Sequence, residues 1–136
     1  MGLLSDIYIS SDGEALSYDA SPEQFTERVQ YKRISPLELS TLWAIIRDVE
    51  WDSLEEPACV LIEDEGERLI HRLPSAMVSD LARLTPDQIG LVSEKWGETE
   101  ELDWPPGEAR PVVEDLVRLA RRAIESGRNV YLWNCV

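Results

Sequence analysis

The sequence predicts an α+β fold, in which a small mixed or antiparallel sheet packs with about five helices. Two features support this prediction most directly. The last 28 residues combine an amphipathic stretch, a glycine and an apolar stretch. Near the middle, two short apolar segments are separated by five residues that include a glycine. The length of 136 residues fits one domain over residues 1–136, with an N-terminal strand, a central hairpin and a C-terminal strand in the sheet.

The C-terminal stretch predicts a long helix followed by a strand. Pro111 suits the first helical turn and Gly127 suits the position after the last. Residues 130–135 alternate between two faces, both apolar, which predicts a central strand rather than an edge strand. The apolar stripe of the helix consists of Val113, Leu116, Val117, Ala120 and Ile124.

Three segments predict where helices begin. Ser21, Ser35 and Thr85 are each followed by proline and, three positions after the hydroxyl, by glutamate or glutamine. This is the capping-box pattern with proline at the first helical position, and it explains these residues better than proline-directed phosphorylation does. The first predicted helix is short, over about 22–28, and residues 29–34 either finish it or form a strand. The second runs over 36–49, and its apolar face extends to Val49.

Residues 3–9 predict a strand, and residues 58–62 and 68–72 predict an antiparallel hairpin around Gly66. Helices follow over 75–84 and 85–96. This pair has the order of a helix-turn-helix, but it has too few bases to meet phosphates, so a plain helical hairpin is the better interpretation. Two acidic loops, 50–57 and 98–108, lie outside the periodic segments.

Composition limits the classes of function. Twenty-seven acidic residues against thirteen basic ones give a net charge of −14, which repels nucleic acid and anionic membranes and attracts basic partners. No apolar run approaches the roughly 20 residues of a membrane span, and no leader is evident. We therefore expect a cytoplasmic protein. Eleven of the thirteen bases are arginine, which suggests a GC-rich, bacterial coding sequence.

Residues suited to catalysis or metal binding are few. His71 is the one histidine, and the spacing of Cys59 and Cys135 fits no zinc motif. Both cysteines lie in apolar segments that predict buried free thiols, which argues against a nucleophilic cysteine–histidine pair. The sequence therefore predicts no catalytic residue, no metal and no cofactor.

The acidic loops each contain a tryptophan. A tryptophan ringed by carboxylates is typical of an interface anchor that enters a pocket of a basic protein while the charges steer association. The alternative is that each ring covers the edge of the core. The predicted protein-binding residues are Trp51, Asp52, Glu55, Glu56, Glu100, Glu101, Asp103 and Trp104.

The leading hypothesis is a non-enzymatic binding protein of the inhibitor or immunity type with a basic protein partner. Two alternatives stay open at this point. One is a small hydrolase-like enzyme that uses aspartate or glutamate carboxylates as acid and base. The other is a homo-oligomeric assembly subunit, because the oligomeric state cannot be read from the sequence.

Overall fold

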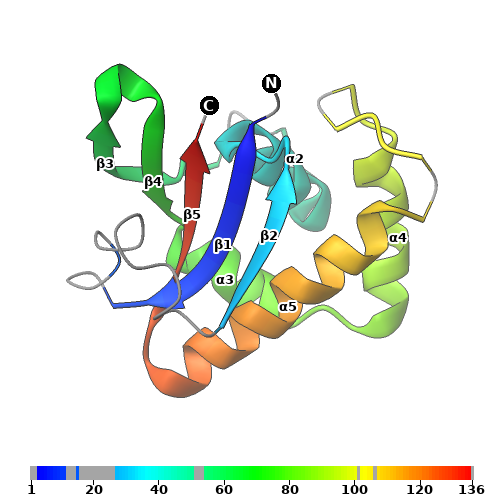
Figure 1. Ribbon diagram of the computed structural model, residues 1–136. Helices are drawn as coiled ribbons and strands as arrows, with labels where there is room; N and C mark the ends of the chain where they lie inside the picture. Colours follow the sequence, from blue (N-terminus) through cyan, green and yellow to red (C-terminus); the bar gives the residue numbers. More distant parts are fainter. Residues whose placement is uncertain are drawn as a thin grey trace.

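The computed structural model describes residues 3–11, 15, 27–50, 54–100, 102–105 and 107–135. Within these ranges, a five-stranded antiparallel sheet packs with four α-helices (Figure 1). The α+β class is confirmed, whereas the helix predicted over 22–28 lies almost wholly outside the described residues. The strands are β1 (Leu4–Ser10), β2 (Arg28–Lys32), β3 (Ala58–Glu63), β4 (Arg68–Arg72) and β5 (Asn129–Cys135). The helices are α2 (Pro36–Arg47), α3 (Ser75–Ala82), α4 (Pro86–Gly97) and α5 (Ala109–Ser126).

The strand order is β2-β1-β5-β4-β3, and every neighbouring pair is antiparallel. β5 is therefore the central strand, as its two apolar faces predict. The stretch that the sequence left open between helix and strand contains β2, in which Val29 pairs with Ile7 of β1. β3 forms the other edge of the sheet and pairs with β4 as the predicted hairpin.

The two faces of the central strands meet different neighbours. Ile7 of β1 and Leu132 of β5 are paired in register, and both belong to the large core shared with the helices. On the opposite face, the rings of Tyr8 and Tyr131 stack with centroids 5.7 Å apart. The Tyr8 hydroxyl donates to the Ala15 carbonyl at 2.8 Å. The alternation of a strand thus places buried apolar side chains on both sides of the sheet.

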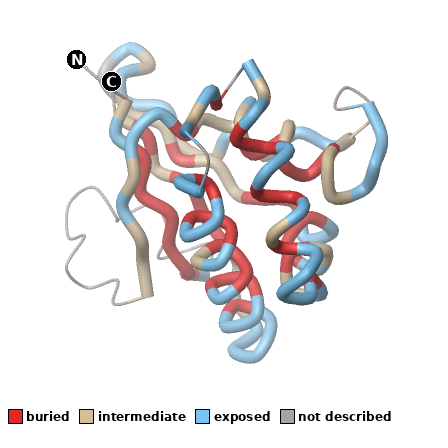
Figure 2. Tube along the Cα trace, turned by 90° about the vertical axis from the view of Figure 1, so that its right-hand side faces the viewer, coloured by how far each residue is buried: buried red, intermediate tan, exposed pale blue. Residues whose placement is uncertain are grey.

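α5 is the helix around which the others are arranged. It packs against α3 and α4 and lies across β1 and β5. Figure 2 shows that the buried residues gather in the interior, while the exposed residues lie on the outer sides of the helices and in the loops. The predicted stripe is correct except for Ile124, which is 52% exposed. Val112, Leu119 and Ala123 are buried instead, because the covered face is turned further round the helix than the stripe suggested. Gly127 ends the helix with φ 67°.

Two predicted capping boxes are present. At α4, the Thr85 hydroxyl accepts from the Gln88 N–H and the Gln88 side chain accepts from the Thr85 N–H. At α2, the Glu38 carboxylate accepts from the Ser35 N–H at 3.3 Å. The Ser21 box lies outside the described residues.

α2 ends at Arg47, before the predicted end at Val49, because Asp48 adopts the left-handed conformation. Val49 is consequently exposed, and its predicted inward position is wrong.

Asp80 of α3 joins α3 to α2. Its carboxylate accepts hydrogen bonds from Trp43 Nε1 at 2.8 Å and from Arg47 Nε at 2.6 Å. Arg83 adds a third bond at 2.7 Å. Burial acts to raise the pKa of the Asp80 carboxyl, but the three donors together outweigh it, so the pKa lies below its ordinary value.

The Asp80→Asn variant is expected to lose about 1–2 kcal/mol of unfolding free energy, since charge-assisted bonds are lost at a site that is only partly open to solvent. The lowered pKa means that Asp80 stabilises the fold above its unfolded pKa of 3.8, and this contribution disappears as the pH falls through the lower folded value. Urea unfolding at neutral and acidic pH tests both points. A variant as stable as the wild type at neutral pH would contradict them.

Candidate functional site

The structure separates the predicted binding residues into two groups. Glu100, Asp103 and Trp104 belong to the loop between α4 and α5, where Glu100 and Asp103 are exposed and Trp104 is half-buried. Glu55 and Glu56 are exposed in the segment before β3, which Figure 1 draws on the opposite side of the molecule from that loop. Trp51, Asp52 and Glu101 lie outside the described residues.

The α4–α5 loop is held by its own backbone. The Trp104 N–H donates to the Gly97 carbonyl at 3.0 Å, and the Asp103 N–H donates to the Thr99 carbonyl at 2.8 Å. The Thr99 hydroxyl in turn donates to the Trp96 carbonyl at 2.7 Å. Leu102 anchors the loop because its side chain is buried in the core. These hydrogen bonds and the burial of Leu102 hold the backbone of Trp104 beside the end of α4.

Trp104 contacts the core and a surface cleft at once. Its ring packs against the fully buried Trp96, with centroids 6.1 Å apart and planes inclined by 50°. Trp96 is itself held by a 2.9 Å hydrogen bond from its Nε1 to the Glu38 carbonyl. The sequence offered two readings of Trp104, an interface anchor or a cover over the core, and its position is compatible with both.

The cleft beside Trp104 has a volume of about 300 Å³ and lies between α4, the loop and the start of α5. Small residues of α4 leave it unfilled, because Gly90, Ser93 and Gly97 recur at helical spacing along one side of that helix. The wall and rim consist of Glu94, Glu98, Trp104, Pro105, Gly107, Ala109 and Arg110.

Charge is distributed unevenly along this cleft. Glu94 and Glu98 are four residues apart and therefore lie on the same side of α4, toward its C-terminal end. Arg110 lies nearer the other end, where its Nη1 would be 3.3 Å from a Cβ placed on Gly90. The sequence prediction missed Glu94 and Glu98 as site residues, although their spacing of four on a predicted helix end was a usable signal.

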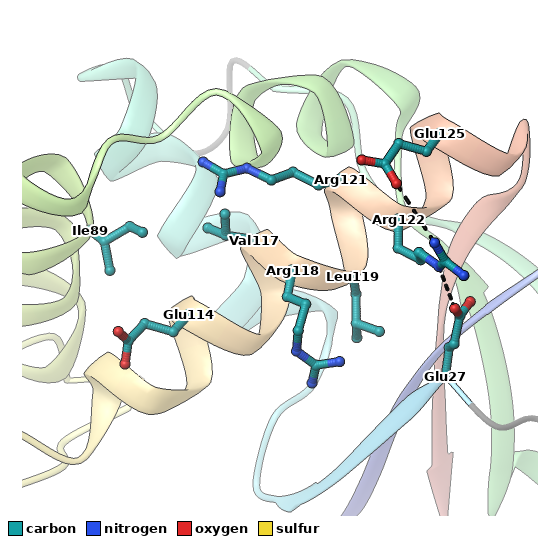
Figure 3. Close-up of a pocket in the computed structure, with 9 residues that line it drawn as sticks. All are labelled: Glu27, Ile89, Glu114, Val117, Arg118, Leu119, Arg121, Arg122 and Glu125. Carbon is teal, nitrogen blue, oxygen red and sulfur yellow. Dashed lines mark hydrogen bonds and ion pairs between the residues drawn. The ribbon is translucent and has the colours of Figure 1, made fainter.

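A second, larger hollow of about 580 Å³ lies over α5 (Figure 3). Three arginines and three glutamates surround it, so its local charge is balanced. Arg121 donates to the carbonyls of Ala82 and Leu84, both at 2.9 Å, and Arg122 donates to Glu27 at 2.6 Å. These arginines tie α5 to the end of α3 and to the start of β2, so we assign them a structural role.

The lowered pKa values of two carboxyl groups, those of Glu27 and Asp80, also favour a structural role for these side chains over a catalytic one. Hydrogen bonds from Arg122 and Arg128 lower the pKa of the Glu27 carboxyl, against an opposing effect of burial. The pKa of Asp80 is lowered as well. A general acid requires a raised pKa, which is the reverse of what these two groups have.

Cys59 and His71 are cross-strand partners on β3 and β4, whereas Cys135 pairs with Arg68 and belongs to the opposite face of the sheet. The prediction that both cysteines are buried is wrong, because Cys59 is exposed and Cys135 is half-buried. Cys59 is exposed because β3 is an edge strand whose faces are poorly covered. Nδ1 of His71 is buried, and among the described residues it has no hydrogen-bond partner that would orient the ring as a nucleophile's base requires.

His71 is expected to make the free energy of unfolding depend on pH near neutrality, because histidine is the side chain whose ordinary pKa lies closest to that range. Burial lowers the pKa of the His71 imidazole below its ordinary 6.5, so the unfolded chain binds a proton at a pH where the folded chain does not. Unfolding free energy should therefore fall as the pH drops below about 6.5. The His71→Asn variant should lack this part of the slope in urea unfolding between about pH 7.5 and 5.5. Equal slopes for both proteins would refute this role.

Comparison of the chain with protein-family models, curated proteins and solved structures found no match. Among the described residues, no helix has the length and apolar character needed to cross a membrane. The same residues contain no group of three or more histidine, cysteine, aspartate or glutamate side chains arranged to hold a metal ion.

Proposed function

We propose that this chain is a protein-binding module of the inhibitor or immunity type that engages a basic protein partner through the surface around Trp104. The observation that carries the proposal is the position of Trp104: its ring packs against the buried Trp96, and the residue lines a cleft that Glu94 and Glu98 also line. An aromatic side chain that is already ordered and partly accessible is a common anchor of protein interfaces.

The charge of the chain supports a basic partner. A net charge of −14 accelerates encounter with a cationic protein and slows encounter with anionic ones. The exposed acids Glu94 and Glu98 line the cleft, and the exposed Glu100 and Asp103 belong to the same loop as Trp104. The long-range field would bring the partner to the molecule, and the cleft would fix where it binds.

We also propose a cytoplasmic location. Cys59 is an exposed thiol that forms no disulfide, and such a thiol persists most readily in a reducing compartment.

Affinity capture with the tagged chain tests this function. The bait is incubated with host lysate at about 50 mM and about 300 mM salt, between which the Debye length falls about 2.4-fold. We expect one basic protein to be retained at the lower salt and released at the higher. The matched baits are Glu94→Gln/Glu98→Gln at the cleft and Glu65→Gln/Glu67→Gln in the β3–β4 hairpin, because both remove two charges.

The cleft variant should lose the partner and the hairpin variant should keep it. Equal capture by both variants would place the binding surface elsewhere. Retention that does not change with salt would contradict the role of the acidic charge.

A further inference from the structure

We infer that the cleft beside Trp104 receives a single arginine side chain of the partner. This inference rests on the proposed function, because it names the group that a basic partner would insert. A cleft of about 300 Å³ is at the small end of the range for ligand sites, so it suits one long side chain better than a folded segment. Within the part of the chain that the structure describes, Arg110 lies above Gly90 and Ala109 lies above Gly97, and the open volume is the remainder of the cleft that these residues line.

Three features at one end of the cleft favour a cation. Glu94 and Glu98 supply two carboxylates from the same side of α4. That end also coincides with the C-terminal turn of α4, where the helix dipole is negative. The aromatic ring of Trp104 adds an attraction for cations, which is strongest for indole among the aromatic side chains.

The same geometry favours arginine over lysine. A guanidinium is planar, weakly hydrated and able to stack on an indole while donating to two carboxylates, whereas an ammonium is a compact, strongly hydrated charge. Trp104, Glu94 and Glu98 all line the cleft, so an inserted guanidinium could meet all three residues. Arg110, at the other end near Gly90, would repel the incoming cation and so direct it toward Trp104.

A titration with short peptides tests the inference. The probes are acetyl-Gly-Arg-Gly-amide and its lysine and citrulline counterparts, where citrulline keeps the shape of arginine without its charge. Binding is read from the indole N–H resonances of the ¹⁵N-labelled protein. The signal of Trp104 is identified by its loss in the Trp104→Leu variant, which keeps an apolar side chain but removes the ring.

We expect the arginine peptide to shift the Trp104 indole signal in a saturable way, and the lysine peptide to bind about two- to fivefold more weakly. Citrulline should cause no saturable shift. Glu94→Gln/Glu98→Gln should weaken arginine binding about five- to tenfold. The control Glu65→Gln/Glu67→Gln should change it less than about twofold.

A citrulline peptide that binds as well as arginine, or an arginine peptide that leaves the Trp104 signal unmoved, would overturn the inference. In either case the proposed function would stand if capture of the basic protein remained sensitive to salt and to the cleft variant. The proposed function would instead be contradicted if the peptides bound as expected while the amount of partner captured changed neither with salt nor with the Glu94→Gln/Glu98→Gln bait.

Discussion

Replacing Trp96 with alanine is expected to lower the free energy of unfolding by about 3–5 kcal/mol. The Trp96 side chain is fully buried, so its loss removes a large apolar surface from the core and leaves a cavity between α2 and α4. The substitution also removes the Nε1 donor of the Glu38 carbonyl, which would be left without that partner. Urea unfolding followed by far-ultraviolet circular dichroism measures the effect.

Trp104→Ala is the matched control for this experiment. Its ring is only half-buried, so its removal should cost clearly less stability than the removal of Trp96. A loss of less than about 1 kcal/mol for Trp96→Ala would show that the core does not depend on this ring. A loss for Trp104→Ala as large as that for Trp96→Ala would show that Trp104 is a core residue rather than a surface anchor.

The second large effect concerns affinity. Trp104→Ala is expected to weaken binding of the basic partner by about 2 kcal/mol, or roughly thirtyfold in Kd. Truncation of a tryptophan anchor at the centre of an interface commonly causes a loss of this size. The loss should be in the dissociation rate, since the ring contributes short-range packing rather than steering. Calorimetry and surface plasmon resonance with the purified partner measure both quantities.

Trp104→Phe serves as the graded control, because it keeps an aromatic ring that is a weaker cation partner. We expect its affinity to lie between those of the wild type and Trp104→Ala. Wild-type affinity in Trp104→Ala, with a normal fold by circular dichroism, would exclude Trp104 as an anchor.

The elements predicted best were those whose signals are local. The two apolar faces of residues 130–135 required a strand with neighbours on both sides, and β5 is the centre of the sheet. The capping boxes at Ser35 and Thr85 marked the starts of α2 and α4, because the residues that make them are adjacent in sequence.

What the sequence left open and what it predicted wrongly both depend on tertiary packing. The sequence around Val29 is compatible with helix or strand, and its pairing with β1 is a contact between distant residues that no local pattern encodes. Cys59 looked buried because its strand is apolar, but β3 is at the edge of the sheet and its faces are poorly covered. Ile124 follows the helical period and is nevertheless exposed, because the neighbours of α5 determine which side is covered.

The candidate site was predictable only in part. Trp104 stood out as an aromatic residue in an acidic loop, which is a local signal. The cleft itself depends on how α4, the loop and the start of α5 pack together, and this arrangement brings Glu94 and Glu98 beside the ring. Charge along the sequence could indicate a basic partner, but it could not distinguish these two carboxylates from the other acids.

The most direct test of a basic partner bound at this cleft is the association rate constant of the captured partner as a function of ionic strength. We predict that the wild-type rate falls by about tenfold or more between low and high salt. Glu94→Gln/Glu98→Gln should associate more slowly than Glu65→Gln/Glu67→Gln at low salt, and the two should converge at high salt. Rates that are independent of salt, or equal for the two variants throughout, would contradict the account.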